Sequence, residues 1–195
     1  MRTLTYVTSN EIKFKVAMQA LKGSGIMLVQ EQLLTPEIQS SSVEEIAGWS
    51  ATWASQRLNK PVVVMDAGFY IEALNGFPGP FIRYINEWFS VQDYLNLMQG
   101  KVNRRVSALD CLAYGHPGEK PMTFCQVHTG KLALEPGQQT GTSIDQLFIP
   151  EGYTIPISDI PVDEMVTYWS HTTVWEALRL SLEDMDFPNQ TNNLS

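Results

Sequence analysis

The stretch that decides the fold reads Val62-Val63-Val64-Met65-Asp66-Ala67-Gly68, and Ala73-Leu74-Asn75-Gly76-Phe77-Pro78-Gly79-Pro80-Phe81 follows it. The β-branched run that ends at Gly68 predicts a strand over residues 61–66 that is buried on both faces. Ligands in open α/β sheets bind beyond the carboxyl ends of such strands, which makes Asp66 a candidate catalytic residue. Taken alone, an aspartate at the end of a strand can also do no more than cap a turn.

A second segment, at the N-terminus, predicts a binding site for phosphate. A strand over residues 4–8 leads into a helix expected over residues 11–22, with Ser9 or Asn10 as its cap. The first turn of that helix offers free backbone N–H groups and the positive end of the helix dipole, and Lys13 lies one turn in. The alternative is an ordinary capped helix that carries a solvated lysine.

Further short motifs accompany these two segments in a fixed order along the chain. The full set is Thr8-Ser9-Asn10 with Lys13, Pro36-Glu37-Ile38-Gln39 with Glu44-Glu45-Ile46, residues 62–68, residues 73–81, Asp145 to Pro150, and Ser170-His171. In this order the motifs resemble the inosine triphosphate pyrophosphatase family, whose members hydrolyse non-canonical purine nucleoside triphosphates. The resemblance runs almost from end to end of the chain, and residues 73–81 are its most specific part.

The order of predicted elements indicates the fold class. A strand over residues 26–30 and a helix over residues 43–58 continue the alternation of the first segments, which argues for a mixed α/β layer arrangement. Residues 105–114 and 122–134 are β-rich on either side of a Gly-His-Pro-Gly turn and predict a long antiparallel hairpin. The resemblance implies an α/β fold with a mixed twisted sheet and flanking helices, in an elongated, two-lobed domain with a central nucleotide cleft.

The reaction implied by the resemblance is hydrolysis between the α- and β-phosphates of a nucleoside triphosphate, which gives a nucleoside monophosphate and pyrophosphate. Asp66 would position or deprotonate the attacking water, and Glu37 and Asp66 would hold a metal ion. Mg²⁺ fits because it binds through one or two carboxylates together with substrate phosphates. The resemblance assigns substrate binding to Thr8, Ser9, Asn10, Lys13, Asp145, Ser170 and His171.

Several positions depart from the family pattern. Ser50 and Val166 stand where the family has lysines, and Met65 stands where it has an acidic residue. Thr142-Ser143-Ile144 replace the Phe-Gly-Trp of a Phe-Gly-Trp-Asp motif, and Thr172 replaces the arginine of Ser-His-Arg. In the family the aromatic segment and the arginine hold the base, so their loss predicts altered base specificity. The other losses remove charge from the phosphate site. Arg83 and Lys101 could supply positive charge, or both could be ordinary surface residues.

Three functions fit this pattern. The first is an active, Mg²⁺-dependent nucleoside triphosphate pyrophosphohydrolase with altered base specificity, and the second is a conventional non-canonical purine hydrolase in which neighbouring residues replace the lost contacts. The third is a catalytically impaired nucleotide-binding or regulatory protein of the same fold. The retained residues Glu37, Asp66, Asp145 and Lys13 favour the first two.

The Ser170-His171 pair is expected to open the last helix, over residues 170–184, with Ser170 as its cap. Adjacent residues at a helix start do not give the geometry of a catalytic triad, so the pair is not interpreted as a nucleophile and its base. By resemblance His171 contacts the nucleotide, and a packing histidine is the alternative. His116 and His128 are expected to be structural or surface residues.

Composition bounds the class of protein. The chain has 195 residues and 44% hydrophobic content, enough for one substantial core or a core in two lobes, and one domain is expected over residues 1–187 before a polar tail over residues 188–195. A formal charge of −8 argues against a general nucleic-acid-binding surface. The absence of a long apolar span or signal peptide predicts no membrane association. Cys111 and Cys125 are interpreted as buried thiols in a reducing compartment, which predicts a cytoplasmic location.

An apolar cluster surrounds the helical segments expected over residues 79–98. Its members are Phe77, Pro78, Phe81, Tyr84 and Trp88. In the family this region contributes to a homodimer interface, so the resemblance implies a homodimer. The alternative is that these aromatic residues only close the core of one chain.

Overall fold

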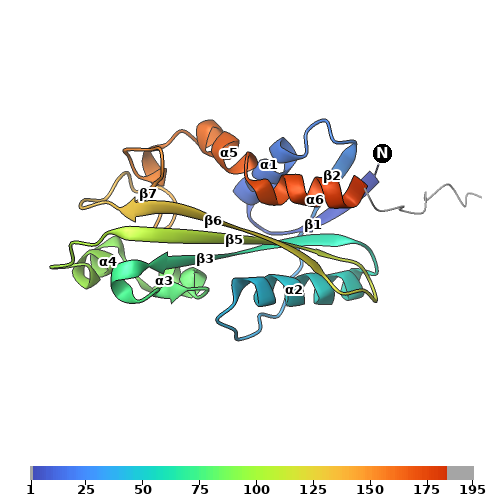
Figure 1. The fold of residues 1–195 in the computed structure, drawn as a ribbon, viewed down its shortest axis with the longest axis horizontal. Helices are drawn as coiled ribbons and strands as arrows, with labels where there is room; N and C mark the ends of the chain where they lie inside the picture. The colour runs from blue at the N-terminus through green and yellow to red at the C-terminus, as the bar shows by residue number, and fades with distance from the viewer. Residues whose placement is uncertain (1, 184–195) are drawn as a thin grey trace, which may run out of the picture.

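The computed structural model describes residues 2–183 and contains one mixed sheet in the order β2-β1-β3-β5-β6-β7 (Figure 1). β1 runs parallel to both β2 and β3, whereas β3, β5, β6 and β7 are joined by antiparallel pairing. The strands are β1 (Arg2–Val7), β2 (Ile26–Glu31), β3 (Val62–Ile71), β4 (Pro78–Gly79, paired with β3), β5 (Arg105–Gly115), β6 (Met122–Leu132) and β7 (Phe148–Pro150). The predicted mixed α/β sheet and the long β5–β6 hairpin are confirmed.

Helices cover both faces of the sheet (Figure 1). One layer holds α1 (Glu11–Ala20), α5 (Val162–Ser170) and α6 (Thr173–Glu183). The opposite layer holds α2 (Val43–Leu58), α3 (Ile82–Trp88) and α4 (Val91–Leu97), and short 3-10 turns occupy Glu72–Leu74 and Ile157–Asp159. The bounds of α2 agree with the helix predicted from the sequence, whereas α5, β4 and β7 were not predicted.

The apolar core is divided between the two ends of an elongated molecule. At one end Tyr6 and Trp175 are fully buried and meet edge to face, with ring centroids 5.6 Å apart. At the other end Phe69 and Phe148 make a similar contact, with centroids 5.1 Å apart. A third cluster lies beneath α2. Because the two main clusters are separate and share the long strands of one sheet, the molecule has the expected two-lobed form.

β3 is longer than predicted, and this changes the position of Asp66. The strand continues to Ile71 and pairs with β5 over its whole length, so Asp66 lies in mid-strand and not at a strand end. Gly68 was interpreted as the end of the strand. Its role is instead to admit α2, because a Cβ at this position would lie 2.7 Å from Cγ2 of Val43 at the start of α2.

The predicted helix over residues 170–184 is two helices, and Ser170 does not cap the second. Ser170 is the last residue of α5, and its Oγ donates to the Thr167 carbonyl at 2.8 Å. α6 begins at Thr173, whose N–H donates to Oε1 of Gln126 on β6 at 2.6 Å. The prediction was wrong because the cap comes from a residue 47 positions away.

The two cysteines form a disulfide, which corrects their interpretation as free thiols. The β5–β6 register places Cys111 directly opposite Cys125, with the Cα atoms 4.1 Å apart. The register of the hairpin could not be derived from the sequence alone. Disulfides persist mainly in oxidising compartments, so the pair removes the argument on which the cytoplasmic prediction rested.

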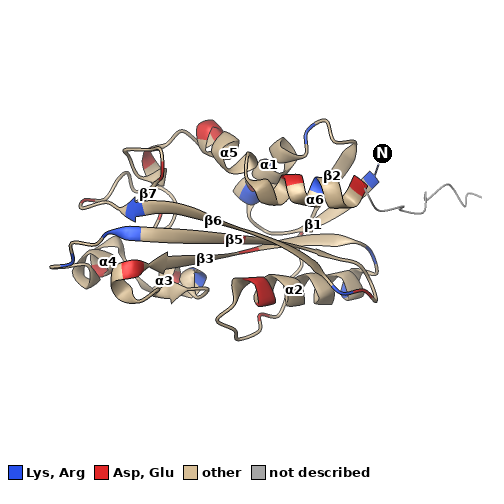
Figure 2. Cartoon of the chain, in the orientation of Figure 1, with Lys and Arg blue, Asp and Glu red and all other residues tan. Residues whose placement is uncertain are grey.

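Within residues 2–183 there is no helix long and apolar enough to cross a membrane. Figure 2 shows the Lys and Arg residues dispersed over several elements of both layers. The proposed tail over residues 188–195 lies outside the described residues, and the domain bounds and the absence of a nucleic-acid partner stay predictions.

Candidate active site

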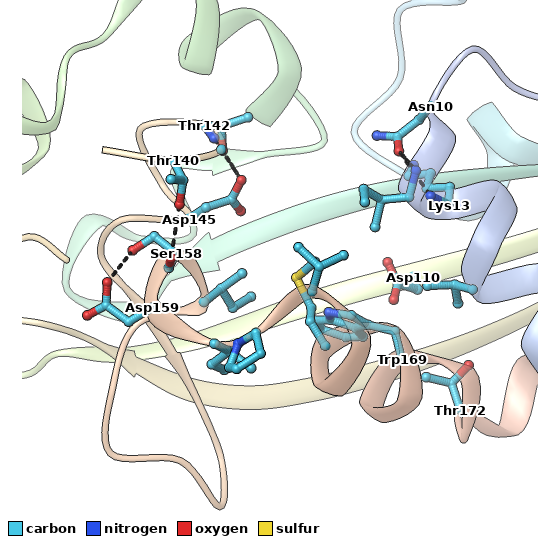
Figure 3. Close-up of a pocket in the computed structure, with 18 of the residues that line it drawn as sticks. Asn10, Lys13, Asp110, Thr140, Thr142, Asp145, Ser158, Asp159, Trp169 and Thr172 are labelled. Atoms are coloured by element: carbon cyan, nitrogen blue, oxygen red, sulfur yellow. Dashed lines mark hydrogen bonds between the residues drawn. The ribbon is translucent and has the colours of Figure 1, made fainter. Parts of the chain in front are cut away.

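A cavity of about 840 Å³ opens between α1, α5 and the loop over residues 138–145 (Figure 3). Its polar wall includes Asn10, Lys13, Asp110 and Asp145. Much of the remaining lining is apolar, and Trp169 on α5 contributes an aromatic wall. Ligand sites commonly combine a mostly apolar cavity of this size with a few polar groups, so this cavity is the candidate binding site.

The N-terminal motif is built around Asn10. Asn10 is the N-cap of α1, and its Oδ1 accepts from the N–H groups of Ile12 and Lys13 at 2.9 and 3.0 Å. Thr8 supports this turn by accepting from the Asn10 N–H at 3.1 Å through Oγ1. The expectation of a cap is therefore confirmed at Asn10 and not at Ser9, which is exposed. The N–H groups expected to be free are partly occupied by the cap itself.

Lys13 lies where one edge of β3 is unpaired. On this edge β1 pairs with β3 as far as Val63 and β4 begins to pair at Phe69. Among the described residues, positions 64–68 of β3 have no strand partner on that side. Lys13 reaches into this gap and donates from Nζ to the Met65 carbonyl at 3.3 Å. A positive charge and unpaired backbone groups therefore meet at the cavity wall, an arrangement that suits an anion.

Asp66 faces away from this cavity. Met65 lines the cavity, and because successive side chains of a strand alternate, Asp66 projects to the side covered by α2. Burial raises the pKa of the Asp66 carboxyl; the charge of Lys13 and the Ala67 N–H, 3.0 Å from Oδ1, oppose this. The charge of Glu37 raises the pKa of Asp66 further. Asp66 is thus a half-buried carboxylate in electrostatic reach of both Lys13 and Glu37.

Glu37 is held by two side chains of α3. The Arg83 guanidinium donates to Oε1 of Glu37 and forms an ion pair with it. The Tyr84 hydroxyl donates to Oε2 at 2.6 Å. The charge of Arg83 also lowers the pKa of Asp66. The structure therefore brings Arg83 to the predicted metal site, whereas Lys101 is exposed and does not line the cavity.

The donor set fits a hard divalent cation. Two carboxylates, Glu37 and Asp66, lie close enough to repel each other, and a cation between them would relieve that repulsion. No group of three or more His, Cys, Asp or Glu side chains suited to a metal occurs within residues 2–183. Mg²⁺ needs no such cage, because it is commonly bound by one or two carboxylates and substrate phosphates.

The other residues predicted to bind substrate lie in different places in the structure. Asp145 lines the cavity, and its Oδ2 accepts from the N–H and the Oγ1 of Thr142, both at 2.8 Å (Figure 3). Ser170 is buried and does not line the cavity. His171 is exposed and lies at a second cavity of about 300 Å³, which shares Thr172 with the first. The structure therefore groups Asn10, Lys13 and Asp145 at the large cavity, whereas Thr8, Ser9, Ser170 and His171 do not line it.

Comparison with known proteins decides the family. The model of the Ham1 family matches residues 4–172. The chain belongs to the Ham1 family. It is 38% identical over 159 residues to a dITP/XTP pyrophosphatase of Methanopyrus kandleri, covering 82% of this chain and 85% of the relative. A dITP/XTP pyrophosphatase of Thermococcus kodakarensis is 35% identical over 161 residues, covering 83% and 86%.

Solved structures support the fold of this Ham1 chain. A HAM1 protein from Coxiella burnetii superposes with a TM-score of 0.78 at 21% identity, covering 95% of this chain and 100% of the other. The Ham1 protein of Staphylococcus aureus gives a TM-score of 0.74 at 19% identity, covering 93% and 98%. The resemblance stated from the motifs is confirmed.

The positions that depart from the family pattern have different surroundings in this Ham1 chain. Met65 and Thr172 line the cavity. Ser50 is buried in α2, and Ile144 is buried in the core of the second lobe and does not line the cavity. Val166 is half-buried on α5 and does not line the cavity.

Asp110 and Trp169 are among the cavity residues of this Ham1 chain that were not predicted. A signal for Asp110 exists, because it is a carboxylate in the otherwise mostly apolar strand Arg105–Gly115. No sequence pattern pointed to Trp169, because α5 itself was not predicted.

Proposed function

We propose that the chain is a Mg²⁺-dependent nucleoside triphosphate pyrophosphohydrolase whose base preference differs from that named for its dITP/XTP pyrophosphatase relatives. Membership of the Ham1 family makes it a hydrolase of nucleoside triphosphates. The observation that carries the proposal is the position of Lys13, which lies between the cavity on one face of β3 and Asp66 on the other.

This arrangement suggests a path for the substrate. The nucleoside occupies the cavity, and the phosphates cross the unpaired edge of β3 beside Lys13 and Asn10. Asp66 takes a proton from water as the water oxygen bonds to the α-phosphorus and the bond from that phosphorus to the bridging oxygen breaks. Mg²⁺ held by Glu37 and Asp66 would neutralise the polyphosphate charge. A raised pKa suits Asp66 to this role, because a stronger base accepts a proton more readily.

Altered base preference is supported by what surrounds the nucleoside end. Thr172 replaces the arginine that the resemblance leads one to expect, and Ile144 is buried away from the cavity. Introducing arginine at Thr172 should raise activity on inosine triphosphate if base recognition is what has changed. An unaltered ratio of activities in Thr172→Arg would contradict that interpretation.

A second function, a catalytically impaired nucleotide-binding protein, is favoured by one observation. Both oxygens of Glu37 already accept hydrogen bonds from Arg83 and Tyr84. A metal ion would have to compete with these donors for Glu37. Titration of the protein with Mg²⁺ in the presence of a non-hydrolysable nucleoside triphosphate measures whether the metal ion binds in spite of these hydrogen bonds.

Pyrophosphate release separates the two functions. The assay uses standard, deaminated and modified ribo- and deoxyribonucleoside triphosphates with Mg²⁺, and compares the unmodified protein with Asp66→Asn. Asp163→Asn, an exposed carboxylate on α5, controls for the loss of charge. Release that only Asp66→Asn abolishes supports the hydrolase; binding without release from any nucleotide supports the impaired protein.

A homodimer is also proposed, on the basis of an exposed aromatic face. Phe81 and Trp88 are 46% and 70% exposed, and Tyr84 packs beside Trp88. Sedimentation of the unmodified protein beside Trp88→Glu tests the proposal. A monomer at micromolar concentration would contradict it.

A further inference from the structure

Asp110 lies on the floor of the cavity, across the sheet from Lys13. The register pairs Asp110 with Ala67 on β3 and with Gln126 on β6, so it stands on the strand next to Met65 and diagonal to it, since Met65 pairs with Leu112. Its side chain is 19% exposed and lines the cavity. In Figure 3 Asp110 lies in the space between Lys13 and Trp169. A nucleoside in the cavity would therefore meet a carboxylate.

The buried side chain of His128 lies behind this carboxylate. Its Nε2 lies 3.4 Å from Oδ2 of Asp110, and its side chain is only 7% exposed. Trp169 packs edge to face on the His128 ring, with centroids 4.7 Å apart. The His128 ring therefore supports the aromatic wall formed by Trp169, and it lies next to Asp110 without a hydrogen bond to it. The expectation that His128 is structural is consistent with this burial.

A second polar residue, Thr172, lines the same cavity. Thr172 is 6% exposed, and its Oγ1 is buried with no hydrogen-bond partner within residues 2–183. Thr172 lines both the large cavity and the smaller one beside His128. A buried hydroxyl without a partner is unfavourable, and a ligand in the cavity could supply the partner only if the Thr172 side chain turned toward it.

These groups define the chemistry of the complementary base. An ionised carboxylate only accepts hydrogen bonds, so the group that meets Asp110 must be a donor. A ring N–H is one donor that guanine and hypoxanthine share, and an exocyclic amino group is a donor that hypoxanthine lacks. A carbonyl oxygen would instead place two acceptors face to face. We propose that Asp110 reads an exocyclic amino group, so that the preferred substrates are purine nucleotides that carry one. This inference rests on the proposed function, because it assumes that the cavity holds the base.

Two purine classes share this chemistry. A guanine-type base offers a 2-amino group beside the ring N–H, and an adenine-type base offers a 6-amino group. Hypoxanthine has neither amino group, and inosine triphosphate differs from guanosine triphosphate only at the 2-amino position. Guanosine and inosine nucleotides therefore form a matched pair in which the amino group alone changes.

The test is calorimetric binding of the α,β-methylene analogues of guanosine, adenosine and inosine triphosphate in the presence of Mg²⁺. The unmodified protein should bind at least one amino-bearing analogue about tenfold or more tightly than the inosine analogue. Asp110→Asn should bring that ratio close to one. Asp163→Asn removes an exposed carboxylate on α5 that does not line the cavity, and should leave the ratio unchanged.

Equal or tighter binding of the inosine analogue to the unmodified protein would overturn the inference, as would an unchanged ratio in Asp110→Asn. If that variant does not fold, the ratio for the unmodified protein still decides. Binding is measured without turnover. Failure of the proposed function would appear separately, as absence of pyrophosphate release from every nucleotide.

Discussion

Replacing Lys13 by methionine removes the positive charge between the cavity and Asp66 while keeping a side chain of similar length. The Lys13 Nζ donates to the Met65 carbonyl at 3.3 Å, and losing one such partly exposed hydrogen bond lowers the free energy of unfolding by about 1 kcal/mol. Losing a positioned donor at a phosphate site costs about 2.7–4 kcal/mol of transition-state stabilisation. The effect on catalysis should therefore exceed the effect on stability, with kcat/KM falling by roughly a hundredfold to a thousandfold.

The same substitution should move the pH profile. The charge of Lys13 lowers the pKa of Asp66, so without it the pKa rises and the base stays protonated to a higher pH. The acid limb of kcat/KM, which reports the free enzyme, should shift upward. The assay is pyrophosphate release across pH for Lys13→Met beside Lys15→Met, an exposed lysine on the same helix. Equal behaviour of the two variants, or lost activity with an unmoved acid limb, would refute the reasoning.

Three further predictions concern stability. Asp66→Asn should raise the free energy of unfolding at neutral pH, because burial raises the pKa of Asp66 and so disfavours its charged form; the gain should vanish below pH 3, and denaturant unfolding at both pH values checks this. Gly68→Ala should lower the free energy of unfolding by about 1–3 kcal/mol, because its Cβ would lie 2.7 Å from a Val43 side-chain carbon. Gly48→Ala, whose nearest contact is at 3.4 Å, should not lower it, and the urea midpoints of the two variants test this difference. Reducing the disulfide, which spans 14 positions, should lower the free energy of unfolding by about 3 kcal/mol, measured by urea unfolding with and without a reductant.

Each of these has a result that would contradict it. A lower unfolding free energy for Asp66→Asn at neutral pH would mean that the native state favours the charged carboxylate. Equal midpoints for the two alanine variants would mean that α2 does not pack closely over β3. Identical unfolding curves with and without reductant would mean that the Cys111–Cys125 disulfide does not stabilise the fold.

Local signals in the sequence predicted the parts of the fold that depend on neighbouring residues. The helix over residues 43–58 was predicted correctly because it has its own cap, with Ser42 accepting from the Glu45 N–H. The hairpin was predicted because β-rich runs flank a turn. The helix break after Ser170 was not, because Gln126 on a distant strand caps α6.

The candidate site shows the same division. Motifs identified Asn10, Lys13, Glu37, Asp66 and Asp145, although their roles remain proposals. The separation of Asp66 from the cavity could not be predicted, because it depends on how far β3 extends and therefore on which face each side chain takes.

Contacts between segments that are distant along the chain could not be predicted from the sequence either. The pairing of Arg83 with Glu37 joins residues 46 positions apart, and the disulfide depends on a hairpin register that composition does not specify. Asp110 and His128 meet because β5 and β6 pair in that same register. Each of these contacts follows from tertiary structure and not from a local pattern.

The most direct test of the account is phosphorus NMR of the products that the unmodified protein and Asp66→Asn form from the preferred nucleoside triphosphate with Mg²⁺. The account predicts equal amounts of nucleoside monophosphate and pyrophosphate from the unmodified protein, and at least a hundredfold slower formation of both by the variant. Nucleoside diphosphate with inorganic phosphate, or unchanged turnover by Asp66→Asn, would contradict it.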